Sequence, residues 1–514
     1  MRKFQLIGLI LVAVFIATLW GSSWLEDKIE SEIQSISFLT YDSLEVRVFS
    51  RSLEIFNLTG KKDKYTGEID LLKLKGLELI PLIRNKQFIV EEILIEGMDL
   101  SYQLIQSEKR GSVETKKNSG PDIPDFLVKS IDVRDGFFSI LDNRDSLLFS
   151  TKLVASMVDF TTRDVRKPRE IPYKLKFLEA DSARFFTKND LYEIDIASLK
   201  YDESSLSIDS IRLTSRVAKL EIGTKVGHEV DWYNASIDSV SLDIVDTKTF
   251  LKQPRVREMI IYQPVLNVFR DKRLPFPKEN RPLLVRDVLS NSEFAFSFDT
   301  IQIQNGSITY EEFVKKEKGP GEVSFAELSS MITNFTSYSF EKNISPRLIS
   351  TCKLYDKTPF YLDVSFPDNV MSTNTYIKGK LLPIDLTVFN KMIKYVSVVE
   401  IESGGSSMLE FEFTHTDKHS TGEMKFAYED LSIAFLEKQE SDSDGVLSAI
   451  KGFFVNTFIV DSNNNFESDK FRVGKVDFHR IENKSMFNFW WGSILTGFKS
   501  STGVDASGKK IDVN

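Results

Sequence analysis

The stretch VEEILIEGMDLSYQL, residues 90–104, carries the pattern that decides the fold. Ile93 and Ile95 stand two residues apart between Glu92 and Glu96, and the alternation resumes at Leu100 and Tyr102 after a glycine. Apolar side chains at every second position are typical of a β-strand that has one apolar face and one wet face. The stretch therefore predicts two short antiparallel strands joined by a tight turn.

The same plan recurs along the chain at a spacing of roughly 40 residues, which indicates a repeat architecture. Clear copies are VKSIDVRDGFFSILD at 128–142 and FDTIQIQNGSITYEE at 298–312, and VREMIIYQPVLNVFR at 256–270 has proline at the glycine position. Asp135-Gly136 and Asn305-Gly306 stand where the turn is expected, and such pairs favour β-hairpins. One hairpin cannot bury its apolar face, so stacked copies predict a long sheet.

A membrane-length apolar segment stands at the N-terminus. The run FQLIGLILVAVFIATLW, Phe4–Trp20, holds no charge and would cover about 25 Å as a helix, close to the thickness of a hydrocarbon core. Arg2 and Lys3 precede it and acidic residues follow, so the positive-inside rule predicts a cytoplasmic stub at 1–3 and a transmembrane helix at 4–20. A cleaved signal peptide is the alternative, although the apolar run is longer than most signal segments.

The predicted fold is therefore mainly β: an N-terminal transmembrane helix followed by an elongated, repeat-built antiparallel β-sheet or groove with a few short helices. Apolar clusters predict those helices at 79–85, 281–290 and 385–395. Composition divides the rest of the chain into an N-terminal module at 21–106, a polar linker at 107–124, a repeating β-hairpin region at 125–380, a helix-plus-β module at 381–436 and a C-terminal region at 437–514.

Composition also narrows the class of function. With 514 residues, of which 41% are apolar, the chain exceeds one compact domain. Its net charge of −9 argues against a nucleic-acid partner, which requires a basic surface. The single cysteine, Cys352, allows no internal disulfide, so stability must come from packing and hydrogen bonds.

Patterns for catalysis or metal binding are weak. His415 and His419 have the spacing of a helical metal pair, but the alternation before them predicts a strand and a turn, on which the rings would not converge. The acidic stretch at 440–445 resembles a calcium loop but has Lys451 where a glutamate is required. The sequence contains no P-loop, dinucleotide-binding or nucleophile-elbow motif. We therefore expect a non-enzyme without a cofactor or metal site, and an exported enzyme is the least favoured hypothesis.

Three stretches resemble the AsmA-like proteins of Gram-negative envelopes, which are relatives of TamB and YhdP. They are the N-terminal segment with the strands that follow it, the recurring Asp/Asn-Gly pair, and 381–436, where a helix precedes alternating strands. The resemblance implies an apolar β-groove that is anchored in the inner membrane and exposed to the periplasm. It also implies phospholipid transport or outer-membrane maintenance, with phospholipid and envelope proteins as partners.

The apolar side of the strands supplies the candidate contact residues for a lipid. We expect the groove to be lined by Ile131, Val133, Ile301, Ile303, Leu409, Phe411 and Phe413. The same face would instead form a closed core if it packed on itself or on a second sheet. The alternative function is a non-catalytic scaffold that binds envelope proteins through its sheet edges.

An aromatic segment, SMFNFWWGSILTGFKSS at 485–501, lies near the C-terminus. It is too short and too often interrupted by polar residues to span a membrane. One interpretation is a helix that packs on the end of the sheet. The other is an interfacial element whose Phe487, Phe489, Trp490 and Trp491 contact a membrane or a partner protein.

Overall fold

The structure, a computed structural model, describes residues 38–503 except 48, 63, 79–87, 105–125, 162–173, 247–249, 251, 278–280, 315–318, 338–343, 370, 398 and 436–460. Strands account for 63% of the described residues and helices for 10%, so this part of the chain is mainly β, as the sequence predicts. The strands form one large mixed sheet. The chain divides into an N-terminal unit, Met1–Asp209, and a C-terminal unit, Ser210–Asn514.

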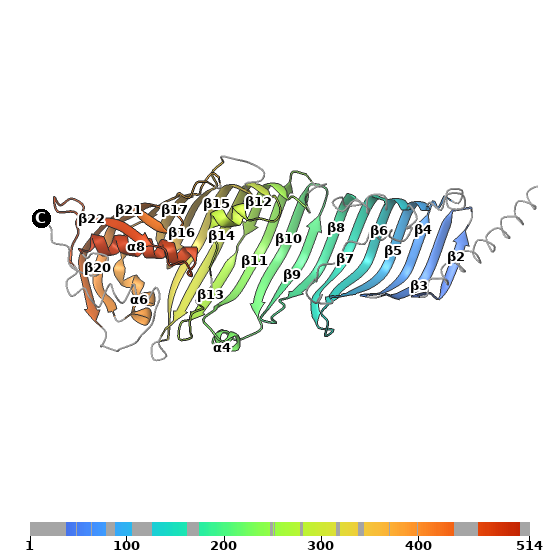
Figure 1. The fold of residues 1–514 in the computed structure, drawn as a ribbon, viewed down its shortest axis with the longest axis horizontal. Coiled ribbons are helices and arrows are strands. Elements are labelled where there is room, and N and C mark those ends of the chain that lie inside the picture. The colour runs from blue at the N-terminus through green and yellow to red at the C-terminus, as the bar shows by residue number, and fades with distance from the viewer. Residues whose placement is uncertain are drawn as a thin grey trace, which may run out of the picture. The chain divides into compact units, whose positions relative to one another are not determined.

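The described part of the N-terminal unit consists of strands joined by turns and loops (Figure 1). Neighbours in sequence pair from β3 to β9, and β1 and β2 both pair with β3. The strands are β1 (Leu39–Thr40), β2 (Ser43–Arg47), β3 (Ser52–Lys62), β4 (Tyr65–Lys75), β5 (Phe88–Gln103), β6 (Phe126–Leu141), β7 (Leu147–Thr161), β8 (Lys174–Phe186) and β9 (Tyr192–Tyr201), and β10 (Ser205–Ser215) continues into the next unit.

The C-terminal unit adds helices to the strands (Figure 1). Its strands are β11 (Asp231–Ile244), β12 (Arg255–Tyr262), β13 (Val265–Asp271), β14 (Ser297–Phe313), β15 (Pro320–Thr336), β16 (Arg347–Leu354), β17 (Thr358–Ser365), β18 (Thr375–Leu381), β19 (Ile384–Asp385), β20 (Val399–His415), β21 (His419–Phe435) and β22 (Val473–His479). Its helices are α4 (Ile222–Val226), α5 (Val285–Ser290), the 3-10 helix η1 (Leu386–Phe389), α6 (Asn390–Val396) and α8 (Met486–Ser501).

The predicted hairpin turns are wrong, because each clear copy of the repeat lies within one long strand. β5, β6 and β14 run for 16, 16 and 17 residues through the expected turn. Gly97, Asp135 and Asn305 have φ values of 63°, 47° and 53° there. The pairing register shifts at Asp135 and Asn305, so these positions are β-bulges. The left-handed backbone that would close a turn inserts an extra residue instead.

The copy with proline behaves in a related way. Gln263, with a φ of 47°, and Pro264 separate β12 from β13. Both strands nevertheless pair in parallel with β14, so the chain keeps its direction across the break. Proline removes a backbone donor, which accounts for the interruption of the ladder at this point.

The sheet is mixed rather than antiparallel throughout, which corrects the prediction. β5 is parallel to β6, and β12 and β13 are parallel to β14. Parallel neighbours need a crossover connection, because the chain must return to the same end of the sheet. α5 lies in the connection between β13 and β14. The other connection includes the predicted linker 107–124, which lies outside the described residues.

Two predicted helices fall within the described residues and are confirmed. The segment 281–290 contains α5, and 385–395 contains η1 and most of α6. Asp385 begins the second, because its carboxylate accepts a hydrogen bond from the Thr387 amide at 2.9 Å. The segments 79–85 and 4–20 lie outside the described residues. Across the described part of the chain, none of the helices has the length and apolar character needed to cross a membrane.

Candidate functional site

The candidate site is an apolar face that crosses the sheet from strand to strand. In the N-terminal unit, the pairing register aligns one apolar residue from every strand between β2 and β9. This row consists of Leu44, Ile55, Leu72, Ile95, Val133, Ala155, Leu178 and Tyr201. A parallel row consists of Leu53, Leu74, Ile93, Ile131, Met157 and Leu175. The face is therefore continuous across the unit.

The bulges extend this face to the other half of each strand. Between Val133 and Gly136, β6 has two residues where β7 has only Val154. In a regular strand Val133 and Phe138 would point to opposite faces, and the extra residue returns Phe138 to the apolar face. A further row then joins the same face, namely Tyr65, Tyr102, Ile140, Phe149, Phe185 and Ile194.

The opposite face of the N-terminal unit is largely polar. Cross-strand ion pairs bridge adjacent strands there, such as Lys75–Glu92 at 2.8 Å and Arg184–Asp195 at 2.6 Å. Exposed pairs of this kind contribute little to stability, about 0–1 kcal/mol each. These pairs make one face of the sheet polar and solvated, whereas the other face is apolar.

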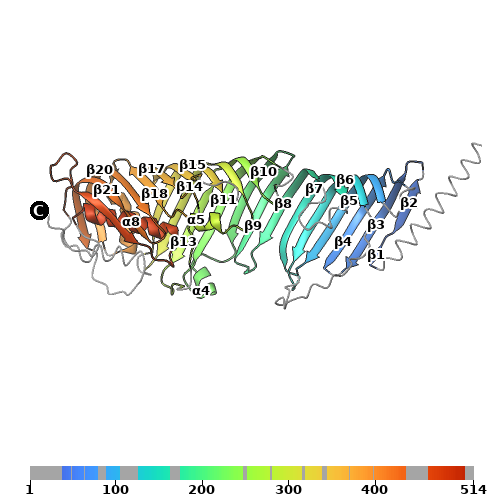
Figure 2. The same cartoon turned by 45° about the horizontal axis from the view of Figure 1, so that its top comes forward.

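No second layer covers the apolar face among the described residues of the N-terminal unit. Figure 2 shows β2–β8 as one layer without a described helix over them, and each strand packs extensively only with its hydrogen-bonded neighbours. In the middle of the face, Val133 is only 5% exposed. Tyr65 is 55% exposed at one margin. A closed sandwich would have buried this face against another sheet.

The C-terminal unit has a similar arrangement of its own. A single row crosses it from β11 to β22 and consists of Leu242, Met259, Ile301, Ile332, Leu348, Val364, Ile377, Phe413, Gly422 and Val476. Ile301 and Ile303, two predicted groove residues, are partly buried. They lie on β14, whose first residues include Phe298, which packs with Leu289 of α5, and α6 also contacts this strand.

Helices cover the last strands of this face. α8 packs on β21 and β22, and α6 packs on β15 and β20. Beneath them the predicted groove residues Leu409, Phe411 and Phe413 are 4–5% exposed and belong to the main hydrophobic core. These three residues therefore contact protein in this structure. Ile131 and Val133 lie on the face that no described helix covers.

The aromatic segment at the C-terminus divides between two helix faces. Phe489 and Trp490 are buried against the sheet, at 1% and 8% exposure. Phe487 and Trp491, which are four residues apart and share one face of α8, are 73% and 41% exposed. Half of the predicted contact patch is thus core, and half faces outward.

A buried ionic cluster lies at the ends of β13 and β14. Lys272 Nζ lies 2.7 Å from Glu312 Oε2, and the Tyr310 hydroxyl donates to the same oxygen at 2.8 Å. Arg270 Nε donates to Asp231 Oδ1 at 2.5 Å. Burial disfavours the charge of Arg270, but Asp231 more than offsets this and raises the pKa of Arg270 above its ordinary value. Each of these charged groups has an oppositely charged partner, as buried charges require. The cluster therefore connects β11, β13 and β14.

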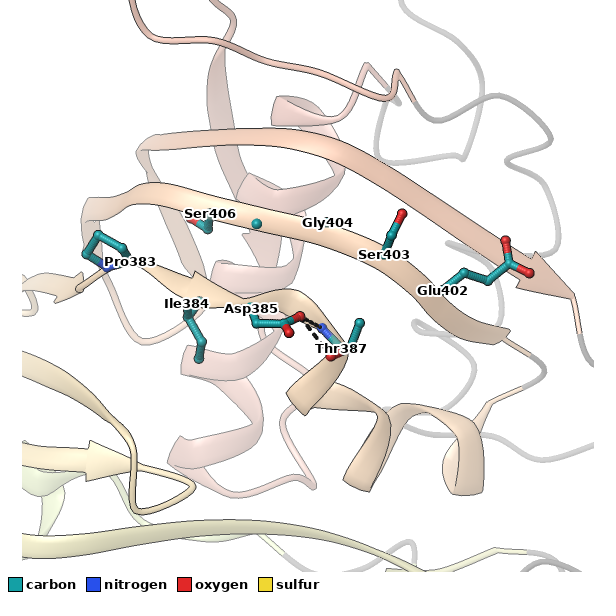
Figure 3. A pocket seen from close by; sticks show the side chains of 9 residues that line it. Pro383, Ile384, Asp385, Thr387, Glu402, Ser403, Gly404 and Ser406 are labelled. Carbon is teal, nitrogen blue, oxygen red and sulfur yellow. Dashed lines mark hydrogen bonds between the residues drawn. The ribbon is translucent and has the colours of Figure 1, made fainter.

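An open depression of about 580 Å³ lies between β19, the start of η1 and residues 402–406 of β20 (Figure 3). The Asp385 carboxylate turns toward Thr387, which donates to it through both its amide and its hydroxyl. These hydrogen bonds lower the pKa of Asp385. Glu402 accepts a hydrogen bond from Ser432 at 2.8 Å. Each of the two carboxylates therefore has a hydrogen-bonding role in local structure.

Sequence reasoning found the apolar face but missed most of its members. Leu72 and Leu153, for example, become aligned with other apolar residues only through the pairing of β4 and β7 with their neighbours. Alternation within each strand was the available signal, and register between strands was the missing information. No protein-family model matches the chain, and no curated protein matches it.

Proposed function

We propose that the chain binds the acyl chains of lipids along its apolar sheet face and carries lipid at or between membranes. The observation that supports this most strongly is the uncovered apolar face of the N-terminal unit, where the described residues provide no second layer. Apolar surfaces of this extent in proteins mark sites for ligands, membranes or partner proteins.

The dimensions suit an acyl chain. Strands in a sheet lie about 4.8 Å apart, so the row from β2 to β9 extends for roughly 34 Å. This length is similar to the hydrocarbon thickness of a bilayer, about 30 Å. An acyl chain lying along the row would contact apolar side chains over its whole length, while its polar end stayed at a margin of the sheet.

The energetics favour reversible binding. Burying a methylene group contributes about 0.8 kcal/mol, so a 16-carbon chain that is half covered by an open face gains roughly 6 kcal/mol. Part of this gain offsets the loss of chain freedom on binding. An open face would therefore hold lipid firmly enough to keep it from water and weakly enough to release it to a membrane.

The resemblance to AsmA-like proteins supplies the finer part of the proposal. We take phospholipid as the ligand class, with the segment 4–20 as an anchor in the inner membrane and the sheet in the periplasm. Outer-membrane maintenance would follow from phospholipid delivery. The uncovered apolar face supports the lipid-binding part of this proposal more directly than it supports the proposed location in the periplasm.

Two adjacent residues of β7 provide a matched test, because they point to opposite faces. Leu153 lies on the apolar face, where its register partner on β6 is Gly136. Val154 points to the polar face and is 37% exposed. A photo-crosslinking residue at position 153 of the full chain should capture phospholipid from the cell membrane, and the same residue at position 154 should not. Lipid mass spectrometry of the purified adducts would identify the ligand.

A charge at the same positions tests binding without crosslinking. Leu153→Asp should reduce co-purifying lipid at least fivefold, whereas Val154→Asp should leave it unchanged, with circular dichroism confirming that both variants fold. Equal crosslinking at both positions, or no lipid with the wild-type chain, would overturn the proposal. Capture of a protein at position 153 would favour the scaffold alternative.

A further inference from the structure

A histidine–aspartate cluster lies on the outer face of the last two strands of the C-terminal unit. His419 begins β21, and its register partner on β22 is His479. Asp477 lies two residues before His479 and therefore on the same face of the strand. The alternating residues Ser420 and Phe478 point the other way, toward α8, where Ser420 hydrogen-bonds Ser493. Strand pairing thus gathers three potential metal ligands at one place.

The ligand atoms are already close. One ligand atom from each of His419, Asp477 and His479 lies within 4.8 Å of the other two. His419 Nε2 is 2.8 Å from Asp477 Oδ1, and the two imidazole rings stack with centroids 4.2 Å apart. The side chains of His419 and Asp477 are 36% and 38% exposed, so an ion can reach them from solvent.

Two imidazoles and one carboxylate suit a divalent metal ion of intermediate softness, such as Zn²⁺. Zn²⁺ binds imidazole nitrogen and carboxylate oxygen at about 2.0–2.2 Å, which places ligand atoms roughly 3.3–3.5 Å apart. The present separations of up to 4.8 Å exceed that spacing, so the side chains of His419, Asp477 and His479 would have to rotate to bind an ion. Three protein ligands leave one position for water, and Lys475 Nζ, 2.8 Å from Asp477 Oδ2, holds the carboxylate from its other side.

We propose that His419, Asp477 and His479 bind one divalent transition-metal ion of the Zn²⁺ type. The ion joins β22 to β21 outside the hydrophobic core and so fastens the strand on which α8 packs. This site is independent of lipid binding, because it lies on the face of β21 and β22 that points away from α8. The competing interpretation is a hydrogen-bonded surface cluster that needs no metal.

Zn²⁺ titration of the full chain, purified in detergent without a polyhistidine tag, tests the proposal. Isothermal calorimetry should show one site in the wild-type chain, and His479→Gln or His419→Gln should weaken it at least tenfold. His228→Gln is the matched control, because His228 lies elsewhere and contacts the backbone of Glu229. It should bind Zn²⁺ as the wild type does.

Two further measurements keep the test decisive. Co²⁺ should give the visible absorption of a site with nitrogen and oxygen ligands in the wild type and in His228→Gln, and this absorption should be lost in His479→Gln. Melting temperature without metal should be unchanged in the variants, and Zn²⁺ should raise it only in chains with all three ligands. Equal Zn²⁺ affinity in wild type and His479→Gln, or no binding below 100 µM (about 5.5 kcal/mol), would overturn the proposal.

Discussion

Trp490 Nε1 donates a hydrogen bond of 3.1 Å to His415 Nε2 and so joins α8 to the sheet. The other ring nitrogen of His415, Nδ1, lies 2.8 Å from the Thr416 carbonyl and donates to it. Nε2 must therefore accept, which requires the neutral imidazole. Burial lowers the pKa of His415 and keeps it in this form.

Acid should consequently loosen α8. Because the pKa of His415 is lower in the folded chain than its unfolded value of about 6.5, the unfolded chain binds a proton first, and stability falls as pH falls below about 6.5. We expect the melting temperature to drop between pH 7.5 and 5.5 and to drop less in His415→Gln. Burial raises the pKa of Glu229, which has the opposite effect on stability as pH falls, so the difference between the two proteins is the informative measurement. Identical pH profiles would contradict the assignment.

Close approach between α8 and β22 depends on glycine. A Cβ added at Gly474 would clash with the Gly497 carbonyl oxygen and with Ser501 Oγ. Gly474→Val should therefore force the helix outward and cost about 1–3 kcal/mol in the free energy of unfolding. Gly405→Val is the control, because an added Cβ there meets nothing within 4 Å. Chemical denaturation of both variants checks the prediction, which fails if they lose equal stability.

The bulge in β6 makes a prediction about backbone strain. Asp135 has a φ of 47°, a conformation that asparagine tolerates and a β-branched residue does not. Asp135→Val should therefore cost about 1–2 kcal/mol, whereas Asp135→Asn should change stability by less than about 0.5 kcal/mol. Asn305 at the corresponding bulge of β14 is consistent with this preference. Equal stability of the two variants in urea unfolding would show that the bulge does not require this backbone.

These positions also show how far the sequence alone could predict the fold. Alternation through Ile93 and Ile95 correctly predicts strands with one apolar face, since a period of two is a local property. An Asp-Gly or Asn-Gly pair supplies positive φ, which serves a hairpin turn and a bulge equally well. Only the neighbouring strand decides between them, and at Asp135 the register with β7 continues past the bulge. The long strands and the parallel strand pairs therefore could not be predicted from local sequence patterns.

The same limit applies to the sites. Phe411 and Ile131 have equivalent patterns in sequence, yet Phe411 lies under helices and, among the helices that the structure describes, none packs over Ile131. Which part of an apolar face is covered depends on where α6 and α8 fold back, and that depends on contacts such as Gly474 with Gly497. His419 and His479 are likewise joined only through the pairing of β21 with β22.

The exposed face of α8 leads to the last prediction. Phe487 and Trp491 are exposed on the helix whose other face is core, and aromatic rings of this kind insert at the headgroup level of membranes. Burying each ring would contribute roughly 1.5–3 kcal/mol, enough for measurable binding by the pair. In a chain without residues 1–37, the double change Phe487→Ser and Trp491→Ser should reduce flotation with phospholipid vesicles at least threefold without lowering the melting temperature. Trp490→Ser should lower the melting temperature, because Trp490 packs in the core and holds His415. If the double variant floats as well as the unchanged chain, the outer face of α8 does not contact membranes.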